Sequence, residues 1–427
     1  MTKARLLLSL LALLVGWAID AHAISLSLQG NGGAGVEPGA AQALYGSDRQ
    51  GRPTLITYVG AAAPDGSTVT DVGVPAMMPD GRVIFGAETT GSDGALRWSI
   101  YYGIPDTPVE RRVVEAVNIK NARDDCRPEL KNDPYPVADA QGSIAFTARG
   151  GPGGDALFLY SHGVFSCLAY PGMKTLEGHE IAILSFGSPQ MGIDGEVAFI
   201  GYLNADDETP QKKSHRQAIL LASQRKGIVA LAVEGELGPN RSRYERPLGL
   251  PTAVASPEGT MVAFTARTPS GGALFLYRSG AVARILPSGT VTRLGPVSFL
   301  SPGRPGLAPD ATTAVLAGCA RIPAIFKLQR GRLNLSLQRG QITPIGTEVE
   351  SLSDPIMTAA GAIFVGATDS EREDRLFVLG PDDSFFEIGE PGIIYRIAMS
   401  SEGRRHTVFT GTLAVNQHGD FAYLGGK

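Results

Sequence analysis

A short phrase recurs seven times along this chain. It is a turn, often Asp-Gly, followed by an apolar stretch that contains Val or Ile, then Ala and Phe. Residues 141–146 (Gln-Gly-Ser-Ile-Ala-Phe) and 194–199 (Asp-Gly-Glu-Val-Ala-Phe) are two clear copies. The glycine of the phrase, replaced by Ala in one copy, falls at positions 81, 142, 195, 259, 311, 361 and 419. A period of 50–64 residues predicts a repeat architecture, because one such unit cannot bury both of its apolar faces alone.

A second phrase follows the first at a regular distance. Residues 156–160 and 273–277 both read Ala-Leu-Phe-Leu-Tyr, and each begins 14 residues after the glycine of its repeat. Asp-Gly turns supply the positive φ angles that tight hairpins need. β-branched and aromatic residues bounded by such turns are typical of buried strands. With 54 Gly and 29 Pro in 427 residues the chain turns often, and we therefore predict an all-β fold built from small antiparallel sheets.

The two ends of the chain complement each other. The seventh copy, at Gly419, stands eight residues from the end of the chain and lacks the second phrase. Residues 43–45 (Ala-Leu-Tyr) supply one near the other end, followed by a predicted strand over 53–59. We therefore predict a seven-bladed β-propeller over residues 40–427, with one blade completed by strands from both termini. An open β-solenoid or tandem β-sandwiches are the alternatives, and they would leave sheet edges that a closed ring removes.

The last repeat carries a longer motif. Asn416-Gln-His-Gly419-Asp-Phe-Ala422-Tyr423 matches Asn-x-x-Gly-x-x-Ala-Phe with Tyr in place of Phe. The other copies keep the glycine and mostly Ala-Phe, but another residue stands at the Asn position. In this the chain resembles the choice-of-anchor tandem repeat family of secreted bacterial proteins. The resemblance implies an exported, propeller-like protein of unknown activity, and it brings no catalytic residues.

The first 39 residues predict export. Lys3 and Arg5 precede the apolar run 6–18, and Ala21-His22-Ala23 is a small-x-small cleavage pattern. These features predict a signal peptide over 1–23, since the apolar run is too short to span a bilayer. Residues 24–39 then form a flexible leader. We expect a secreted or periplasmic protein, without a membrane span and monomeric.

The cysteines and the net charge bear on a possible disulfide and on which ligands the protein can bind. A disulfide is permitted in an exported protein, and the favoured bridge joins Cys126 to Cys167, because Cys319 lies in an apolar run. Other pairings among the three cysteines stay open. The net charge of −4 supplies no basic field, which argues against nucleic-acid binding. No spacing of His, Cys or carboxylates predicts a metal site, and no cofactor is expected.

No catalytic motif is found in the chain, and catalytic residues stay unassigned. Acidic clusters at 124–125, 206–208 and 371–374 are interpreted as solvated surface, as are the basic groups 212–216 and 241–246. The favoured function is a non-enzymatic binding or scaffold propeller for an extracellular protein or glycan. The alternative is a glycan hydrolase or lyase whose acids converge on the central funnel from different blades, ~5–10 Å apart.

Overall fold

The computed structural model describes fifteen stretches of the chain. They are residues 43–47, 53–78, 80–105, 107, 113–117, 127–139, 141–151, 154–184, 189–204, 215–371, 374–381, 384–388, 394–395, 413–415 and 421–426. The chain divides into two units, Met1–Ala40 and Ala41–Lys427, and the described residues all belong to the second. The predicted signal peptide and leader, and Cys126, lie outside the described residues.

The strands of these stretches form seven sheets. One contains β3 (Thr68–Val72), β4 (Ala76–Met77), β5 (Val83–Thr90), β6 (Leu96–Gly103) and β7 (Val113–Glu115). The next contains β8 (Val137–Ala138), β9 (Ile144–Gly151), β10 (Gly154–Ser161) and β11 (Val164–Ala169). A third contains β12 (Ile181–Leu184), β13 (Gln190–Met191), β14 (Val197–Asn204), β15 (His215–Ser223) and β16 (Gly227–Val233).

The chain continues through three further sheets. The first contains β17 (Glu245–Leu248), β18 (Thr252–Ser256), β19 (Gly259–Thr268), β20 (Gly271–Arg278) and β21 (Ala281–Pro287). The second contains β22 (Val291–Thr292), β23 (Gly295–Leu300), β24 (Gly306–Leu307), β25 (Thr313–Cys319), β26 (Ile322–Gln329) and β27 (Arg332–Gln338). The third contains β28 (Val349–Leu352), β29 (Ile356–Met357), β30 (Ile363–Asp369), β31 (Asp374–Leu379) and β32 (Phe385–Ile388).

The remaining sheet joins the two ends of the second unit. β1 (Ala43–Ser47) lies between β2 (Pro53–Tyr58) and β35 (Phe421–Gly426), and it pairs antiparallel with both. The register places Tyr45 opposite Tyr423 and Leu44 opposite Leu424. β33 (Ile394–Tyr395) and β34 (Leu413–Val415) pair with the other edge of β35. The pairing between the two ends that the sequence predicted is therefore present.

Each sheet follows the plan that the two phrases predicted. The first phrase occupies the second strand, as in β9 and β19, and the second phrase occupies the third, as in β10 and β20. These two strands pair antiparallel in register, with Phe146 opposite Phe158 and Phe264 opposite Phe275. The all-β prediction is confirmed.

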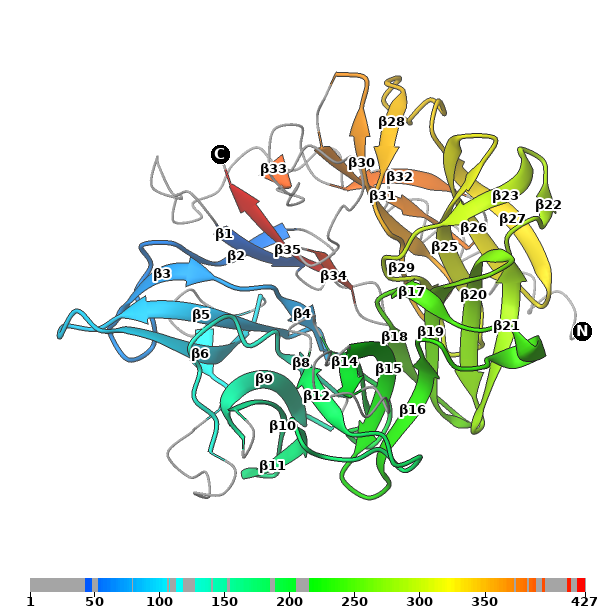
Figure 1. Cartoon of the computed structure of the whole chain (residues 1–427). Coiled ribbons are helices and arrows are strands. Elements are labelled where there is room, and N and C mark those ends of the chain that lie inside the picture. Colours follow the sequence, from blue (N-terminus) through cyan, green and yellow to red (C-terminus); the bar gives the residue numbers. More distant parts are fainter. Residues whose placement is uncertain are drawn as a thin grey trace, which may run out of the picture. The chain divides into compact units, whose positions relative to one another are not determined.

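The short innermost strands bring the sheets together. β4 contacts β8, and the contacts continue through β13, β18, β24, β29 and β34, which contacts β4 again. Figure 1 shows the sheets fanning out around these strands, which gives a propeller-like arrangement.

The phenylalanines of the first phrase fill the spaces between neighbouring sheets. Phe146, Phe199 and Phe264 are all buried, as predicted. Phe199 packs with Leu157 and Leu159 of the preceding sheet in one apolar cluster. The phrase is therefore a core strand, in which Phe fills space between sheets.

The cysteines agree with the sequence as far as the structure describes them. Cys167 is disulfide-bonded, whereas Cys319 is a buried free thiol in β25. Because Cys126 lies outside the described residues, the Cys126–Cys167 pairing stays a prediction.

Candidate functional site

A recurring hairpin links most sheets to the next, and the sequence reasoning missed it. Two glycines six residues apart bound the hairpin, and all of them have positive φ, at 60 and 66, 172 and 178, 289 and 295, and 340 and 346. The positive φ is the reason for glycine, since other residues rarely adopt it. The corresponding segment 235–244 begins at Gly235, also with positive φ. A search for this spacing would have found these linking hairpins in the sequence.

Three consecutive linking hairpins expose a large apolar side chain at one equivalent position. Leu237, Val291 and Ile342 stand two residues after the first glycine and are 63%, 82% and 59% exposed. The same position in the two earlier hairpins is taken by Ala62 and Lys174. Each of the three stands on a separate hairpin at the equivalent position.

These hairpins lie at one end of their sheets, beside the turn between the second and third strands. The backbone N–H of Ser288 donates to the carbonyl of Gly272 at 2.8 Å, and that of Arg339 donates to the carbonyl of Pro323 at 3.0 Å. Val297 of β23 pairs with Cys319 at the end of β25. We call this end the hairpin face, made of the hairpins 235–244, 289–297 and 339–348 and the turns 267–272 and 318–323.

The net charge of −4 conceals a strong asymmetry along the chain. Residues 237–347 contain 13 Lys and Arg but three Asp and Glu, which leaves +10. Because the whole chain carries −4, the remaining residues carry −14. The basic residues of this segment extend well beyond the group 241–246.

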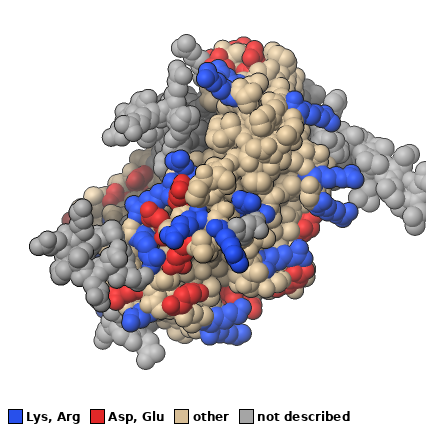
Figure 2. All heavy atoms as spheres, turned by 45° about the vertical axis from the view of Figure 1, so that its right-hand side comes forward, with Lys and Arg blue, Asp and Glu red and all other residues tan. Residues whose placement is uncertain are grey.

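Several arginines of the hairpin face are exposed and form no ion pair with a described residue. Arg293, Arg321 and Arg339 make no ion pair with any residue that the structure describes. Arg246, by contrast, pairs with Glu234. Figure 2 turns the right-hand side of Figure 1 forward and shows Lys and Arg, with Asp and Glu among them at the top, on the left and below, around a broad uncharged area.

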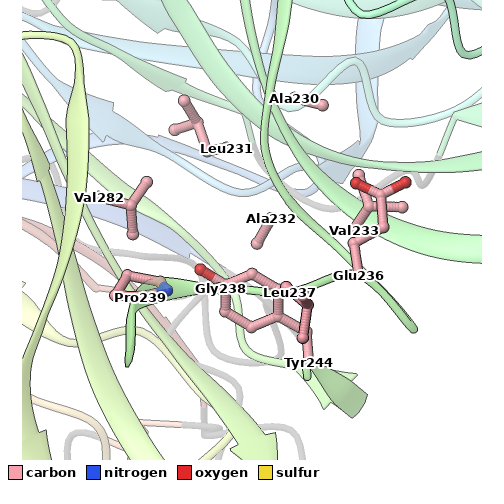
Figure 3. A pocket seen from close by; sticks show the side chains of 10 residues that line it. All are labelled: Ala230, Leu231, Ala232, Val233, Glu236, Leu237, Gly238, Pro239, Tyr244 and Val282. Atoms are coloured by element: carbon pink, nitrogen blue, oxygen red, sulfur yellow. The ribbon is translucent and has the colours of Figure 1, made fainter. Parts of the chain in front are cut away.

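A pocket of about 250 Å³ opens beside the first of these hairpins. The outermost strand β16 and the hairpin form two of its sides, and Val282 of β21 lies across from them (Figure 3). Glu236 at its rim accepts from Arg216 Nη1 at 3.0 Å and lies 3.2 Å from His179 Nε2. These contacts fix the Glu236 carboxylate as part of the wall.

Two acids, Asp133 and Asp354, join neighbouring sheets through hydrogen bonds. Asp133 accepts the backbone N–H of Val74 at 2.8 Å and that of Tyr135 at 3.0 Å, one on each carboxylate oxygen. Asp354 accepts the Ser301 hydroxyl at 2.8 Å. Burial is the main cause that raises the pKa of each to about 6.

Asp71 also raises the pKa of Asp133, so two acids do come near each other there. Both oxygens of Asp133 are occupied by backbone donors, however, and a Cβ at Gly73 or Gly86 would lie within about 3 Å of its carboxylate. With its oxygens held in this way, the carboxylate acts as a structural link between two sheets. The pair does not support the glycan-cleaving alternative.

These two carboxylates should make stability depend on pH. Their folded pKa of about 6 lies above the ordinary value of 3.8, so the folded state binds more protons between about pH 4 and 6. Each group then loses roughly 3 kcal/mol of stabilisation as the pH rises through this window. We expect the free energy of unfolding in urea to fall from pH 4.5 to 7.5, and to fall less in D133N/D354N. An unchanged slope in that variant would contradict this.

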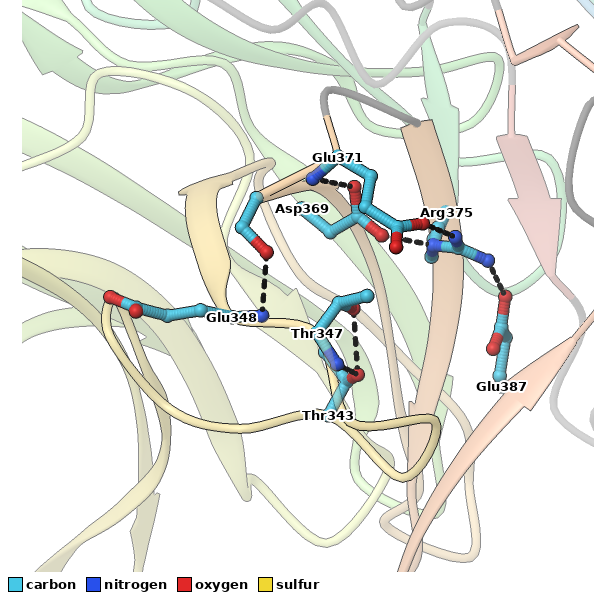
Figure 4. A network of polar contacts seen from close by, with 8 residues as sticks. Thr343, Thr347, Glu348, Asp369, Glu371, Arg375 and Glu387 are labelled. Atoms are coloured by element: carbon cyan, nitrogen blue, oxygen red, sulfur yellow. Dashed lines mark hydrogen bonds and ion pairs between the residues drawn. The ribbon is translucent and has the colours of Figure 1, made fainter.

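A second group of acids surrounds one buried arginine (Figure 4). Arg375 of β31 donates to Asp369, to Glu387 at 2.9 Å and to Glu371 at 3.4 Å. The arginine and Asp369 are almost completely buried. Glu371 of the predicted surface cluster 371–374 is thus engaged in an ion network, which holds the turn between β30 and β31. With a guanidinium between the carboxylates, they are not an acid pair for catalysis.

Neither a membrane helix nor a metal cluster is found in the described stretches. No helix there is long and apolar enough to cross a membrane. Three or more His, Cys, Asp or Glu that could hold one metal ion also do not come together in this part of the chain.

No protein-family model matches the chain, and no curated protein matches it. Among solved structures it is similar to a puromycin hydrolase, at 15% identity and a TM-score of 0.42, over 75% of this chain and 47% of that one. It is also similar to prolyl oligopeptidase B from Galerina marginata, at 9% identity and a TM-score of 0.44, over 75% of this chain and 44% of that one. A third similar structure is a protein of unknown function from Dyadobacter fermentans, at 12% identity and a TM-score of 0.35, over 83% of this chain and 95% of that one. This chain spans about half the length of the first two, and likenesses this weak carry no argument about activity.

Proposed function

We propose that this protein is an exported, non-enzymatic binding or scaffold propeller whose hairpin face binds an acidic extracellular polypeptide. The observation that carries the proposal is the charge of +10 over residues 237–347, of which six arginines belong to the hairpin face: Arg241, Arg243, Arg267, Arg293, Arg321 and Arg339. Arginines without ion pairs stand there beside exposed aliphatic side chains. Interfaces between proteins are enriched in Arg and depleted of Lys, and 12 of the 13 cations of this segment are Arg.

We infer further that the sheets form a closed ring of seven blades. The unbroken series of contacts from β4 through β34 and back to β4 supports this, as does the sheet shared by β1 and β35. A closed ring holds the linking hairpins at constant spacing. The three exposed apolar side chains, Leu237, Val291 and Ile342, then present a rigid row to a partner, which lowers the entropy cost of binding.

A polypeptide fits this row better than a glycan does. Leu237, Val291 and Ile342 are aliphatic and gain free energy by burial against other apolar groups. The guanidinium groups recognise carboxylates bidentately. Acidic residues interspersed with leucines combine both features, so a partner segment of this composition is the expected ligand.

Charge reversal on the hairpin face tests the proposal. The probe is a fluorescein-labelled peptide with five Glu-Glu-Leu repeats, and fluorescence anisotropy measures its affinity. Replacing attraction by repulsion at two guanidinium groups removes roughly 2 kcal/mol or more. R293E/R321E should therefore weaken binding at least ~10-fold.

The matched control is R330E/R332E, which makes the same charge change at the opposite end of β26. Arg321 and Arg330 both have positive φ, so the backbone cost is matched as well. The control should change affinity by less than ~2-fold, because surface charges far from the contact are screened. Equal losses in both variants, or binding of a Glu-Glu-Gly peptide as tightly as the leucine peptide, would refute the proposed face.

A further inference from the structure

A second hollow, of about 590 Å³, lies beside β6. Residues 97–98 of β6 line it, together with the segment 127–130 and Gly150 of β9. The strands β6 and β9 belong to neighbouring sheets (Figure 1). A volume of this size is within the ~300–1,000 Å³ typical of small-molecule sites. None of these residues belongs to the hairpin face.

Trp98 supplies the largest apolar surface of the hollow. Residues two apart in a strand lie on the same face, so Trp98 is on the face of β6 that carries Ile100. Ile100 packs with Ile144 and Phe146 of the neighbouring sheet, so the indole faces that sheet as well. Trp98 is half-buried, and it makes no ring contact or hydrogen bond with any residue in the described stretches. Part of the indole is therefore available to a ligand.

The opposite wall of the hollow is held against β9. The backbone N–H of Glu129 donates to the carbonyl of Arg149 at 2.8 Å, and that of Arg149 donates to the carbonyl of Glu129 at 3.2 Å. A Cβ at residue 150 would lie 1.8 Å from the carbonyl oxygen of Arg127, so only glycine allows this close approach. The φ of Gly150, +104°, also favours glycine. The hollow is therefore already formed in the free protein.

Two charged side chains of this wall offer hydrogen bonds of opposite kinds. Arg127 is exposed, and its guanidinium makes neither an ion pair nor a hydrogen bond with a residue that the structure describes. It is therefore free to donate. Glu129 is exposed as well and contacts Lys131 at 3.0 Å through Oε2, which leaves Oε1 to accept. A ligand hydroxyl can both donate and accept, so hydroxyl groups suit both side chains.

We propose that this hollow binds a sugar ring of a glycan, with a C–H face of the ring on the Trp98 indole and its hydroxyl groups on Arg127 and Glu129. A pyranose ring has apolar faces and a polar edge, which match the two kinds of wall. A purely apolar side chain would cover Glu129 without a donor, and burying an unpaired carboxylate is unfavourable. The favoured class is β-1,4-linked hexopyranoses, because their mostly equatorial hydroxyl groups leave C–H groups on the ring faces.

Tryptophan fluorescence tests the site, because Trp17 and Trp98 are the two tryptophans of the chain. In the full chain with Trp17→Phe, all indole emission comes from Trp98. Titration with cellohexaose, mannohexaose and chitohexaose should shift this emission to shorter wavelength for at least one of them, since stacking removes water from the indole. Emission that none of the three sugars changes would overturn the proposal.

Two variants then locate the contact, with calorimetry measuring affinity for the sugar that binds. Trp98→Ala should weaken binding at least ~10-fold, as truncation of a central tryptophan does. Arg127→Gln should weaken it roughly 2- to 13-fold, the range of one hydrogen bond. Because Arg127 is exposed, this second variant should keep the melting temperature and report on binding alone.

The matched controls are Phe299→Ala and Arg293→Gln. Phe299 is an aromatic side chain that is 42% exposed on another sheet, and Arg293 is another arginine without an ion pair to a described residue. Both controls should leave affinity for the sugar unchanged. Equal losses in the controls, or unchanged affinity in Trp98→Ala, would refute the site.

The hollow and the hairpin face can fail separately. R293E/R321E should leave affinity for the sugar unchanged, and Trp98→Ala should leave affinity for the Glu-Glu-Leu peptide unchanged. Loss of peptide binding in Trp98→Ala would assign the hollow to the polypeptide ligand instead, and would overturn the glycan.

Discussion

Deleting residues 40–60 is expected to abolish cooperative folding of the whole second unit. The deletion removes β1 and β2, and with them Leu44 and Ile56, which are buried in a cluster that also contains Phe85 and Ala422. It also leaves the edge of β35 that pairs with β1 without a partner. An unpaired edge next to an opened core promotes aggregation. The loss should therefore be global, and not a local fraying of one sheet.

The measurement is thermal unfolding together with size-exclusion chromatography. The control is deletion of residues 24–39, the predicted leader, which should leave the melting temperature unchanged. A 40–60 deletion that stays monomeric and keeps its melting temperature would refute ring closure. The open solenoid would then become the better description.

Replacing Phe264 by Ala is expected to destabilise the protein by ~3–5 kcal/mol, the range for large aromatic side chains in a core. Phe264 is completely buried and stacks on Phe275, with centroids 5.4 Å apart and planes 15° from parallel. Its cluster contains residues from two neighbouring sheets, such as Ile219 and Phe275. The cavity left by Ala cannot collapse easily, because the strands around it are held by their ladder hydrogen bonds.

Urea unfolding measures this change, with Phe299→Ala as the control. Phe299 is 42% exposed in β23, so its replacement should cost less than about 1 kcal/mol. A change below about 1 kcal/mol for Phe264 would show that the recurring phrase does not build the core.

Local sequence patterns were sufficient to predict most of the fold. The Gly-x-x-Ala-Phe phrase predicted the buried second strand, and Ala-Leu-Phe-Leu-Tyr predicted its neighbour, because turn chemistry and side-chain alternation act over a few residues. The unpaired phrase at 43–45 even predicted a long-range contact, since a sheet edge needs a partner. The linking hairpins could also have been predicted. Their positive φ angles require glycine at two positions, and the two glycines recur six residues apart in the sequence.

The sequence by itself determined the all-β class, the repeat and the burial of its phenylalanines, because each depends on local conformation and on the need to bury apolar surface. The uneven distribution of charge can also be read from the sequence, but the place of each charged side chain on the molecule cannot. Only the tertiary structure places Arg321 on the hairpin face and Arg330 at the opposite end of β26. It likewise brings Tyr244, Gly238 and Val282 around one pocket. Such juxtapositions depend on how separate sheets pack, and no local pattern encodes that packing.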